Sequence, residues 1–330
     1  MPNSNVKILI ASPAPPGTQL GNRVTAERWR DHLNGIGHTA SIKSTHPSDA
    51  ELEEADVLVA LHALRSAHLI RRWRDSRGTA PLILIMTGTD LYRDLLADPA
   101  TLESVRQADR VVLLHRLGSR VLPVDQQDKC RVVVQSQPIR ERAELRDPEH
   151  FEFVCVGHLR SVKDPLRAAH ALEQLIELSE VRLTQIGRAL DAEWAEQARA
   201  FEVRDGRYRW LGELPREQGL ATMAGARIAL STSQMEGGAN IVIEALAHQV
   251  PLIVSGIDGN LGLLGEDYPG QFPVGDTRAL AQLMERCVTD TDFVASLEMA
   301  CARQRDSVEP ETERDCIRSL LAEVTEHDLL

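Results

Sequence analysis

The sequence lacks the short motifs that identify several common classes of protein. Its histidines show no HExxH or comparable metal-binding spacing, and its five cysteines are widely spaced and form no CxxC pair. We therefore expect no metal site, and we expect Cys155, in the apolar run FVCV, to be a buried, reduced thiol. The GxGxxG fingerprint of dinucleotide-binding oxidoreductases and the GxxxxGK[ST] phosphate-binding loop are also absent, which disfavours both classes.

The sequence also has fewer basic than acidic residues, and it lacks long apolar runs. The chain has 49 acidic and 37 basic residues among 330, a formal net charge of -12, which argues against a nucleic-acid binder and against binding to anionic membranes. No apolar run approaches the length of a membrane span, and the first residues show no signal-peptide pattern. We expect a soluble cytoplasmic protein in which local Arg and Lys meet any anionic ligand. The oligomeric state stays open.

Short β-rich apolar runs alternate with longer helical patterns along the chain, which is typical of parallel sheets built from βαβ units. The length and the 43% of hydrophobic residues are sufficient for two domains, each with its own core. The fold class is therefore α/β, with two Rossmann-like doubly wound parallel-sheet domains that face each other across a cleft. The predicted strands are 6–11, 39–42, 57–61, 82–86, 111–114, 132–134, 153–156, 181–186, 208–211, 228–230 and 252–254.

The domain boundary is predicted in the charged stretch 140–150, RERAELRDPEH, which contains nothing strand-like. This gives an N-terminal domain of residues 1–145 and a C-terminal domain of residues 146–330. The stretch 276–330 is predicted to be helical, and part of it is expected to pack back against the N-terminal domain. Ligands of such folds bind at the carboxyl ends of the strands, so the functional residues are sought there.

The segment 236–251, EGGANIVIEALAHQVP, is the most informative part of the chain. Its glycine pair lets the backbone pass close to a ligand and predicts a helix start with free N–H groups. These N–H groups and the helix dipole favour an anion such as a diphosphate. The donor-binding residues predicted from this turn are Gly237, Gly238, Ala239 and Asn240.

Two carboxylates frame this segment, and both can accept hydrogen bonds from the hydroxyls of a sugar or ribose. Glu244 lies in a helix that is apolar nearly all the way round, so we expect it to be buried and to need protein partners or ligand hydroxyls. The alternatives are an exposed Glu at the rim of the helix and, for Glu236, a charge that only complements the helix dipole.

Charged and polar residues follow strands of the second half. Arg160 and Lys163 come after the strand 153–156, and two cations there would neutralise a diphosphate. Their alternative is a solvated pair of surface charges. Glu213 and Leu214 follow the strand 208–211 and could frame a flat base with backbone groups.

Polar loops also follow three strands of the first half. Gly21, Asn22 and Arg23 could hold an anion at a helix start, although an ordinary βα turn would look the same. Asp90 could instead be a helix cap, and His62 could be a strand-end residue whose hydrogen bonds are satisfied within the protein. The predicted acceptor-binding residues are Gly21, Asn22, Arg23, His62, Arg65, Thr89 and Asp90.

Together these features resemble the GT-B glycosyltransferases of the large retaining family that contains sucrose and bacterial mannosyl transferases. The family's E-x7-E motif matches Glu236 and Glu244, and its lysine matches Lys163, whereas its usual Arg after the strand glycine is His158 here, leaving Arg160 as a substitute. The resemblance implies that the first Glu meets the donor sugar, the second the ribose, and the basic residues the diphosphate. The catalytic residues it implies are Lys163, Arg160 and Glu236.

A narrower resemblance, to the selenosugar synthases of selenoneine biosynthesis, rests on the strings SPAPPGTQLGNRVTA, TGTDLY, GHLRSVKDP, YRWLGELP, MEGGANIVIEAL and GNLGLLGEDYPG. It implies transfer of a sugar from a UDP-sugar, with UDP-N-acetylglucosamine as the expected donor, to selenophosphate, without a cofactor. Selenophosphate is a strong anionic nucleophile that does not need a general base but does need cations, for which Arg23 and Arg65 are expected. A glycosyltransferase with a hydroxyl or thiol acceptor, a UDP-sugar epimerase and an idle UDP-sugar-binding module are the alternatives.

Overall fold

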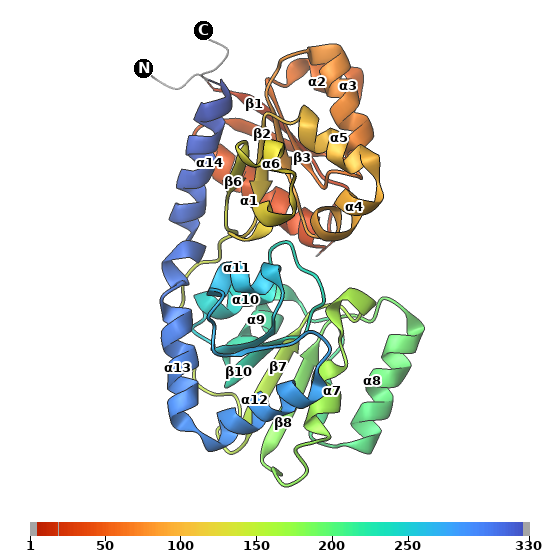
Figure 1. The fold of residues 1–330 in the computed structure, drawn as a ribbon. Helices are drawn as coiled ribbons and strands as arrows, with labels where there is room; N and C mark the ends of the chain where they lie inside the picture. Colours follow the sequence, from red (N-terminus) through yellow and green to blue (C-terminus); the bar gives the residue numbers. More distant parts are fainter. Residues whose placement is uncertain (1–4, 19, 326–330) are drawn as a thin grey trace. The chain divides into compact units, whose positions relative to one another are not determined.

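Two parallel sheets organise the chain, each within its own unit. The computed structural model describes residues 5–18 and 20–325. The described residues up to Ser136 and from Pro310 onward form the first unit, and Gln137–Glu309 form the second. Every strand pairing in this described part is parallel, and helices connect successive strands, as Figure 1 shows. The predicted fold class, α/β with Rossmann-like parallel-sheet units, is confirmed.

The first unit has the strand order β2-β1-β3-β4-β5-β6. Its strands are β1 (Lys7–Ala11), β2 (Thr39–Lys43), β3 (Val57–Leu61), β4 (Leu82–Ile85), β5 (Arg110–Leu113) and β6 (Cys130–Val132). Its helices are α1 (Gly21–Gly35), α2 (Asp49–Glu54), α3 (Ala67–Arg77), α4 (Leu95–Ala97), α5 (Pro99–Gln107), α6 (Val124–Gln127) and α14 (Pro310–Thr325), with a π-helical turn η1 (Asp90–Asp94) and a 3₁₀ turn η2 (Gly118–Val121).

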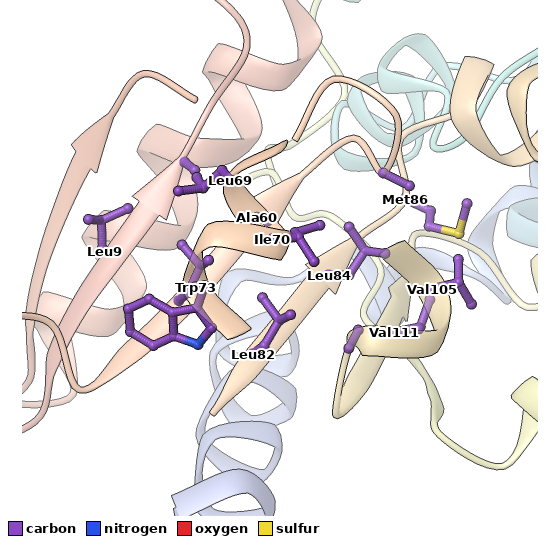
Figure 2. Close-up of a cluster of buried hydrophobic side chains, with 14 of the residues drawn as sticks. Leu9, Ala60, Leu69, Ile70, Trp73, Leu82, Leu84, Met86, Val105 and Val111 are labelled. Atoms are coloured by element: carbon purple, nitrogen blue, oxygen red, sulfur yellow. The ribbon is translucent and has the colours of Figure 1, made fainter. Parts of the chain in front are cut away.

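Both faces of this first sheet are buried, which explains why its strands read as continuous apolar runs. Successive residues of a strand point to opposite faces, so Leu9 packs on one side of β1 and Ile8 on the other. Figure 2 shows the layer that contains Leu9, in which Trp73 of α3 packs with Leu82 and Leu84 of β4. The other layer is covered by α1 and α14.

The C-terminal helix α14 belongs to this first unit. It packs on α1, near the other end of the chain, and contributes Ile317, Leu320, Leu321 and Val324 to the apolar layer (Figure 1). Glu313 of α14 is only 1% exposed and accepts hydrogen bonds from Arg28 Nε at 3.1 Å and from the Ser136 backbone N–H at 2.8 Å. Burial acts to raise the pKa of this carboxyl, but Arg28, His32 and Ser136 together lower it, so the group stays ionised.

The second unit has the strand order β12-β11-β10-β7-β8-β9. Its strands are β7 (Phe151–Val156), β8 (Val181–Ile186), β9 (Tyr208–Trp210), β10 (Ile228–Ser231), β11 (Leu252–Ser255) and β12 (Gln271–Phe272), of which β12 was not predicted. Its helices are α7 (Arg167–Leu172), α8 (Ala192–Arg204), α9 (Arg216–Ala224), α10 (Asn240–Ala247), α11 (Asp258–Leu264), α12 (Thr277–Thr289) and α13 (Thr291–Ala302), with 3₁₀ turns η3 (Ser161–Lys163) and η4 (Arg305–Val308).

The charged stretch around residue 140 was predicted to contain the domain boundary, but the structure holds it on the second unit. The units divide at 136/137, before the predicted boundary at 145/146, and the chain rejoins the first unit at Pro310. The Arg140 N–H donates to the Ala247 carbonyl at 2.8 Å, and the Arg142 guanidinium donates to the Ala224 carbonyl at 2.8 Å. These bonds satisfy carbonyl groups at the ends of α10 and α9, so the stretch is held on the second unit.

Candidate active site

The strand order of the second sheet reverses between β7 and β10. From this pair the sheet extends through β8 and β9 on one side and through β11 and β12 on the other. The connections that leave the carboxyl ends of β7 and β10 therefore diverge, and ligands of such sheets bind at this point. Lys163 in η3 and Glu236 in the loop after β10 come from these two connections. The Lys163 ammonium forms an ion pair with the Glu236 carboxylate.

Hydrogen bonds within the Glu236 loop and between it and the Lys163 loop fix this pair. The Ser233 hydroxyl donates to Glu236 Oε1 at 2.6 Å, and the Thr232 hydroxyl donates to the backbone carbonyl of Lys163 at 3.0 Å. Lys163 also binds Oε1 of Glu236, so the other oxygen, Oε2, lies outside these bonds. Glu236 is 9% exposed, and the pair therefore presents a held carboxylate beside a cation.

A buried polar network supports the Glu236 loop from below. The Asn260 side chain is fully buried and donates to the Ser255 carbonyl at 2.9 Å, and the Ser255 hydroxyl donates to the Ser233 carbonyl. Gly259 has no room for a side chain, because a Cβ there would lie 2.2 Å from the Glu236 carbonyl oxygen. These residues were not predicted, although the polar Asn260 inside the apolar segment GNLGLL was an available signal.

Glu244 is buried, as the apolar helix around it predicts. It is 8% exposed on α10, and its Oε1 lies 3.0 Å from Arg216 Nη2 at the start of α9. The Arg216 side chain is 43% exposed and also donates to Gln137 at 3.1 Å. The carboxylate therefore has a protein partner that is itself largely in solvent. Arg216 was not predicted, because its proximity to Glu244 depends on how α9 packs against α10.

The glycine pair lies before the helix and not at its first turn. Helix α10 begins at Asn240 and its N-cap residue is Ala239, so Gly237 and Gly238 form the approach to the cap. No side chain caps this helix start within the described residues, and no acidic residue occupies its first turn. The prediction of a helix N-terminus open to an anion therefore stands, displaced toward Ala239 and Asn240.

Basic residues directly follow the strand glycines of β7 and β8. His158 follows Gly157, and Arg188 follows Gly187 in the same way. A Cβ at Gly187 would lie 2.0 Å from the Gly157 carbonyl oxygen, so only glycine allows these loops to touch. The Leu159 N–H donates to the Arg188 carbonyl at 2.9 Å. Arg188 was not predicted. A usable signal was present, because a glycine followed by a basic residue comes after both β7 and β8.

The His158 imidazole is half-buried among charges. Burial lowers its pKa most, Glu213 raises it, and Arg188, Arg160 and Lys163 lower it. The ring is thus neutral at neutral pH. Within the described chain its buried Nδ1 has no hydrogen-bond partner. Arg160 is exposed and shares a tight turn with Lys163, whose N–H donates to the Arg160 carbonyl at 2.9 Å.

The predicted base-framing residues follow β9 on the same edge of the sheet. The Gly187 N–H donates to the Gly212 carbonyl at 2.8 Å, which ties this loop to the one that carries Arg188. Glu213 is exposed, with Oε2 3.8 Å from Arg188 Nε, and Leu214 is half-buried. The structure thus brings Glu213 toward the basic cluster.

A small cavity lies beneath Lys163. It is lined by Cys155, Gln185 and the hydroxyl-bearing residues at the end of β10, and its volume is about 20 Å³. Gln185 is buried and its Oε1 has no hydrogen-bond partner among the described residues. The cavity is polar and large enough for about one water molecule. It is too small for a sugar.

The predicted acceptor residues occupy the carboxyl edge of the first sheet, whose order reverses between β1 and β3. Gly21, Asn22 and Arg23 begin α1 after β1, and Arg23 Nε pairs with Glu27 Oε1 at 2.6 Å. Arg65, after β3, is exposed. These positions keep Arg23 and Arg65 as predictions for an anion.

Asp90 and His62 have structural roles in place of the predicted ligand contacts. Asp90 is fully buried, and its carboxylate accepts the backbone N–H groups of Ala63 at 2.9 Å and Thr87 at 2.8 Å, together with that of Gly88. It therefore holds the loops after β3 and β4 together, beyond the helix cap that was the alternative. His62 is 2% exposed with a left-handed φ of 70°, and its Nε2 lies 3.0 Å from Thr89 Oγ1.

A further histidine at this edge escaped prediction. His115, just after β5, is fully buried, with Nε2 2.8 Å from the Tyr92 hydroxyl and with Nδ1 accepting the Leu117 N–H at 3.2 Å. Burial lowers its pKa to about 4, so the ring is neutral at neutral pH. Its position directly after an apolar strand was the available signal.

Across residues 5–18 and 20–325, no helix has the length and apolar character needed to cross a membrane. In the same residues, no group of three or more His, Cys, Asp and Glu side chains is arranged to hold a metal ion.

Comparison with known proteins gives this geometry a family context. Residues 150–290 match the family model described as glycosyl transferases group 1. The matched segment contains the Lys163–Glu236 pair and Glu244. This stretch of the second unit is therefore similar to the group 1 glycosyl transferases.

Similar proteins cover nearly the whole chain. The glycosyltransferase 1 domain-containing protein 1 of Xenopus tropicalis is 24% identical over 329 residues, which is 91% of this chain and 94% of that protein. Sucrose-phosphate synthase from Thermosynechococcus elongatus has a TM-score of 0.81 at 15% identity, covering 98% of this chain and 100% of its own. Anabaena HepE, crystallised with UDP and glucose, has a TM-score of 0.75 at 16% identity, covering 97% and 100%. The fold is therefore that of the GT-B glycosyltransferases.

Proposed function

We propose that the protein is a glycosyltransferase that takes its sugar from a UDP-sugar bound at the carboxyl edge of the second sheet. The observation that carries the proposal is the Lys163–Glu236 ion pair at the point where the strand order reverses, within the segment that matches the group 1 family. HepE, which was crystallised with UDP and glucose, supports a UDP-sugar as the donor.

Each side chain of the pair suits one part of such a donor. The Lys163 ammonium can bind the diphosphate, while Oε2 of Glu236 accepts a hydroxyl of the sugar. Glu244 accepts a ribose hydroxyl in exchange for Arg216, whose solvent-exposed side chain is free to move aside. The two carboxylates of the E-x7-E motif thus divide the donor between them.

The transfer step breaks the bond between the anomeric carbon of the sugar and a diphosphate oxygen, and the electron pair leaves with UDP. The charge that develops on the diphosphate is stabilised by Lys163 and by the backbone N–H groups at the start of α10. These groups are already in position, because the Glu236 loop is fixed by Ser233 and the network behind it.

The proposed acceptor is selenophosphate and the proposed sugar is N-acetylglucosamine. This part of the proposal is supported by long strings in both units that resemble those of selenosugar synthases. Selenium attacks the anomeric carbon and a C–Se bond forms as the bond to UDP breaks. An anionic nucleophile of this kind needs cations more than a base, and Arg23 and Arg65 are the proposed cations.

The test is to incubate the purified protein with UDP-N-acetylglucosamine, with and without selenophosphate. We expect UDP release only when selenophosphate is present, and a selenium-containing sugar by mass spectrometry. UDP release with a hydroxyl or thiol acceptor, and none with selenophosphate, would overturn the acceptor and keep the donor. An isomerised UDP-sugar without release of UDP would indicate an epimerase, and nucleotide binding without turnover would indicate an idle binding module.

A further inference from the structure

The neutral imidazole of His158 lies at the carboxyl edge of β7. A second cation at this position, beside Lys163, would stabilise the diphosphate of a sugar-nucleotide donor. His158 follows Gly157 directly, in the turn that leads to Lys163. Its buried Nδ1 has no hydrogen-bond partner in the described chain, so this ring atom is left for a ligand or a solvent molecule.

We propose that His158 supplies a second positive charge for the donor diphosphate by taking up a proton when the diphosphate binds. The inference rests on the proposed function, because it assigns a residue to the diphosphate of that same donor.

The charges that face the ring account for the change of state. Arg160 and Lys163 lie on the same loop, and Arg188 acts on the ring from the loop after β8, which is hydrogen-bonded to the His158 loop through the Leu159 N–H and the Arg188 carbonyl. Glu213, from the loop after β9, is the acidic group acting on it, since Glu236 after β10 is held by Lys163. Without a ligand, this excess of cations and the partial burial of the ring keep it neutral.

A bound sugar nucleotide reverses this balance. Its diphosphate carries two fixed negative charges, which offset the neighbouring cations and favour the imidazolium. Both ring nitrogens of an imidazolium are donors, so Nδ1 can then donate to a phosphate oxygen or to a solvent molecule beside it. The proton comes from the solvent and returns to it when the nucleotide leaves.

Calorimetric titration with UDP-N-acetylglucosamine, in the absence of an acceptor, tests this directly. The sugar nucleotide is preferred to UDP because the terminal phosphate of UDP titrates with a pKa of about 6 and would itself exchange protons. At pH 7, in two buffers that differ in ionisation enthalpy, we expect the observed heats to differ by the uptake of part of a proton. The Kd should rise up to about tenfold per pH unit between the pKa values of the free and bound ring.

Two substitutions separate charge from structure. His158→Arg carries a permanent charge, so it should bind the nucleotide without proton uptake and with a Kd independent of pH. His158→Gln should bind about tenfold more weakly at pH 6.5, also without uptake, because a charge-assisted bond is lost. The exposed His170 on α7 provides the matched control, and His170→Gln should keep the uptake.

The results separate the role of His158 from the proposed glycosyltransferase function. Tight binding by the unsubstituted protein with no proton uptake, or uptake that persists in His158→Gln, overturns the role of His158 and leaves the glycosyltransferase proposal intact. Failure of the unsubstituted protein to bind any UDP-sugar overturns both.

Discussion

The carboxyl edges of the two sheets share a topology but satisfy their polar side chains differently. In the second unit, Lys163 binds Glu236 and Arg216 binds Glu244, so charged side chains meet other side chains. In the first unit, Asp90 accepts backbone N–H groups. A ligand can replace a side-chain partner that reaches into solvent, whereas a carboxylate bonded to backbone is part of the loop itself. Buried polar residues at strand ends are therefore of two kinds: those whose side-chain partner a ligand can replace, and those whose bonds to backbone N–H groups hold a loop together.

Removal of the Asp90 carboxylate should have the largest effect. Asp90→Ala leaves the N–H groups of Ala63 and Thr87 buried without partners, and we expect the free energy of unfolding to fall by roughly 3–5 kcal/mol. Denaturant unfolding measures this, with Asp75→Ala, an exposed acid on α3, as the control. Unchanged stability combined with lost turnover would instead make Asp90 a ligand-binding group and remove the contrast between the edges.

The opposite pattern is expected for Lys163. Lys163→Ala removes the cation proposed to stabilise the departing diphosphate, so kcat should fall by about 10²–10³ while the unfolding curve shifts little. Arg278→Ala, an exposed cation on α12, is the control and should keep full activity. If Lys163→Ala retained wild-type kcat, the chemistry would have to lie elsewhere in the chain.

The buried His115 predicts a pH dependence that belongs to the first unit. Its pKa is about 4 in the folded protein against about 6.5 when unfolded, so the unfolded state binds more protons between these values. The free energy of unfolding should therefore fall as the pH drops from 6.5 towards 4, by about 3 kcal/mol in all. Unfolding curves at pH 7 and pH 4.5 measure this loss. His115→Gln should lose less stability over that range, and equal losses in both proteins would show that His115 is not the titrating group.

The smallest effect is expected at Glu244. Glu244→Gln should weaken the proposed hydrogen bond to the ribose, so the donor Kd should rise about tenfold with kcat nearly unchanged. Arg216→Ala sharpens the comparison, because loss of the competing partner should leave donor binding equal or tighter. Weaker binding in Arg216→Ala would instead assign Arg216 to the nucleotide, and Glu217→Gln, exposed on the same helix, serves as the control.

Much of the fold follows from the sequence, because strands buried on both faces appear as continuous apolar runs. Each predicted strand overlaps a strand of the structure, although β12, with only Gln271 and Phe272, left no run to detect. The boundary was misplaced because Arg140 and Arg142 look like solvated linker residues until the carbonyl groups that they bind are known.

The site residues could be predicted only where the local sequence around each residue indicates its role. The spacing of Glu236 and Glu244 and the position of Lys163 after β7 are local features. The partnership of Arg216 with Glu244 and the support from Asn260 arise from packing between elements. The string TGTD reads equally well as a ligand loop or a closed turn, and only the burial of Asp90 distinguishes them.

The most direct test of the donor site is a crystal structure of the protein with UDP-N-acetylglucosamine bound. We expect the diphosphate to contact Lys163, a sugar hydroxyl to contact Glu236, and a ribose hydroxyl to contact Glu244, with Arg216 moved aside. A nucleotide bound away from the ends of β7 and β10, with the Lys163–Glu236 and Arg216–Glu244 pairs undisturbed, would contradict it.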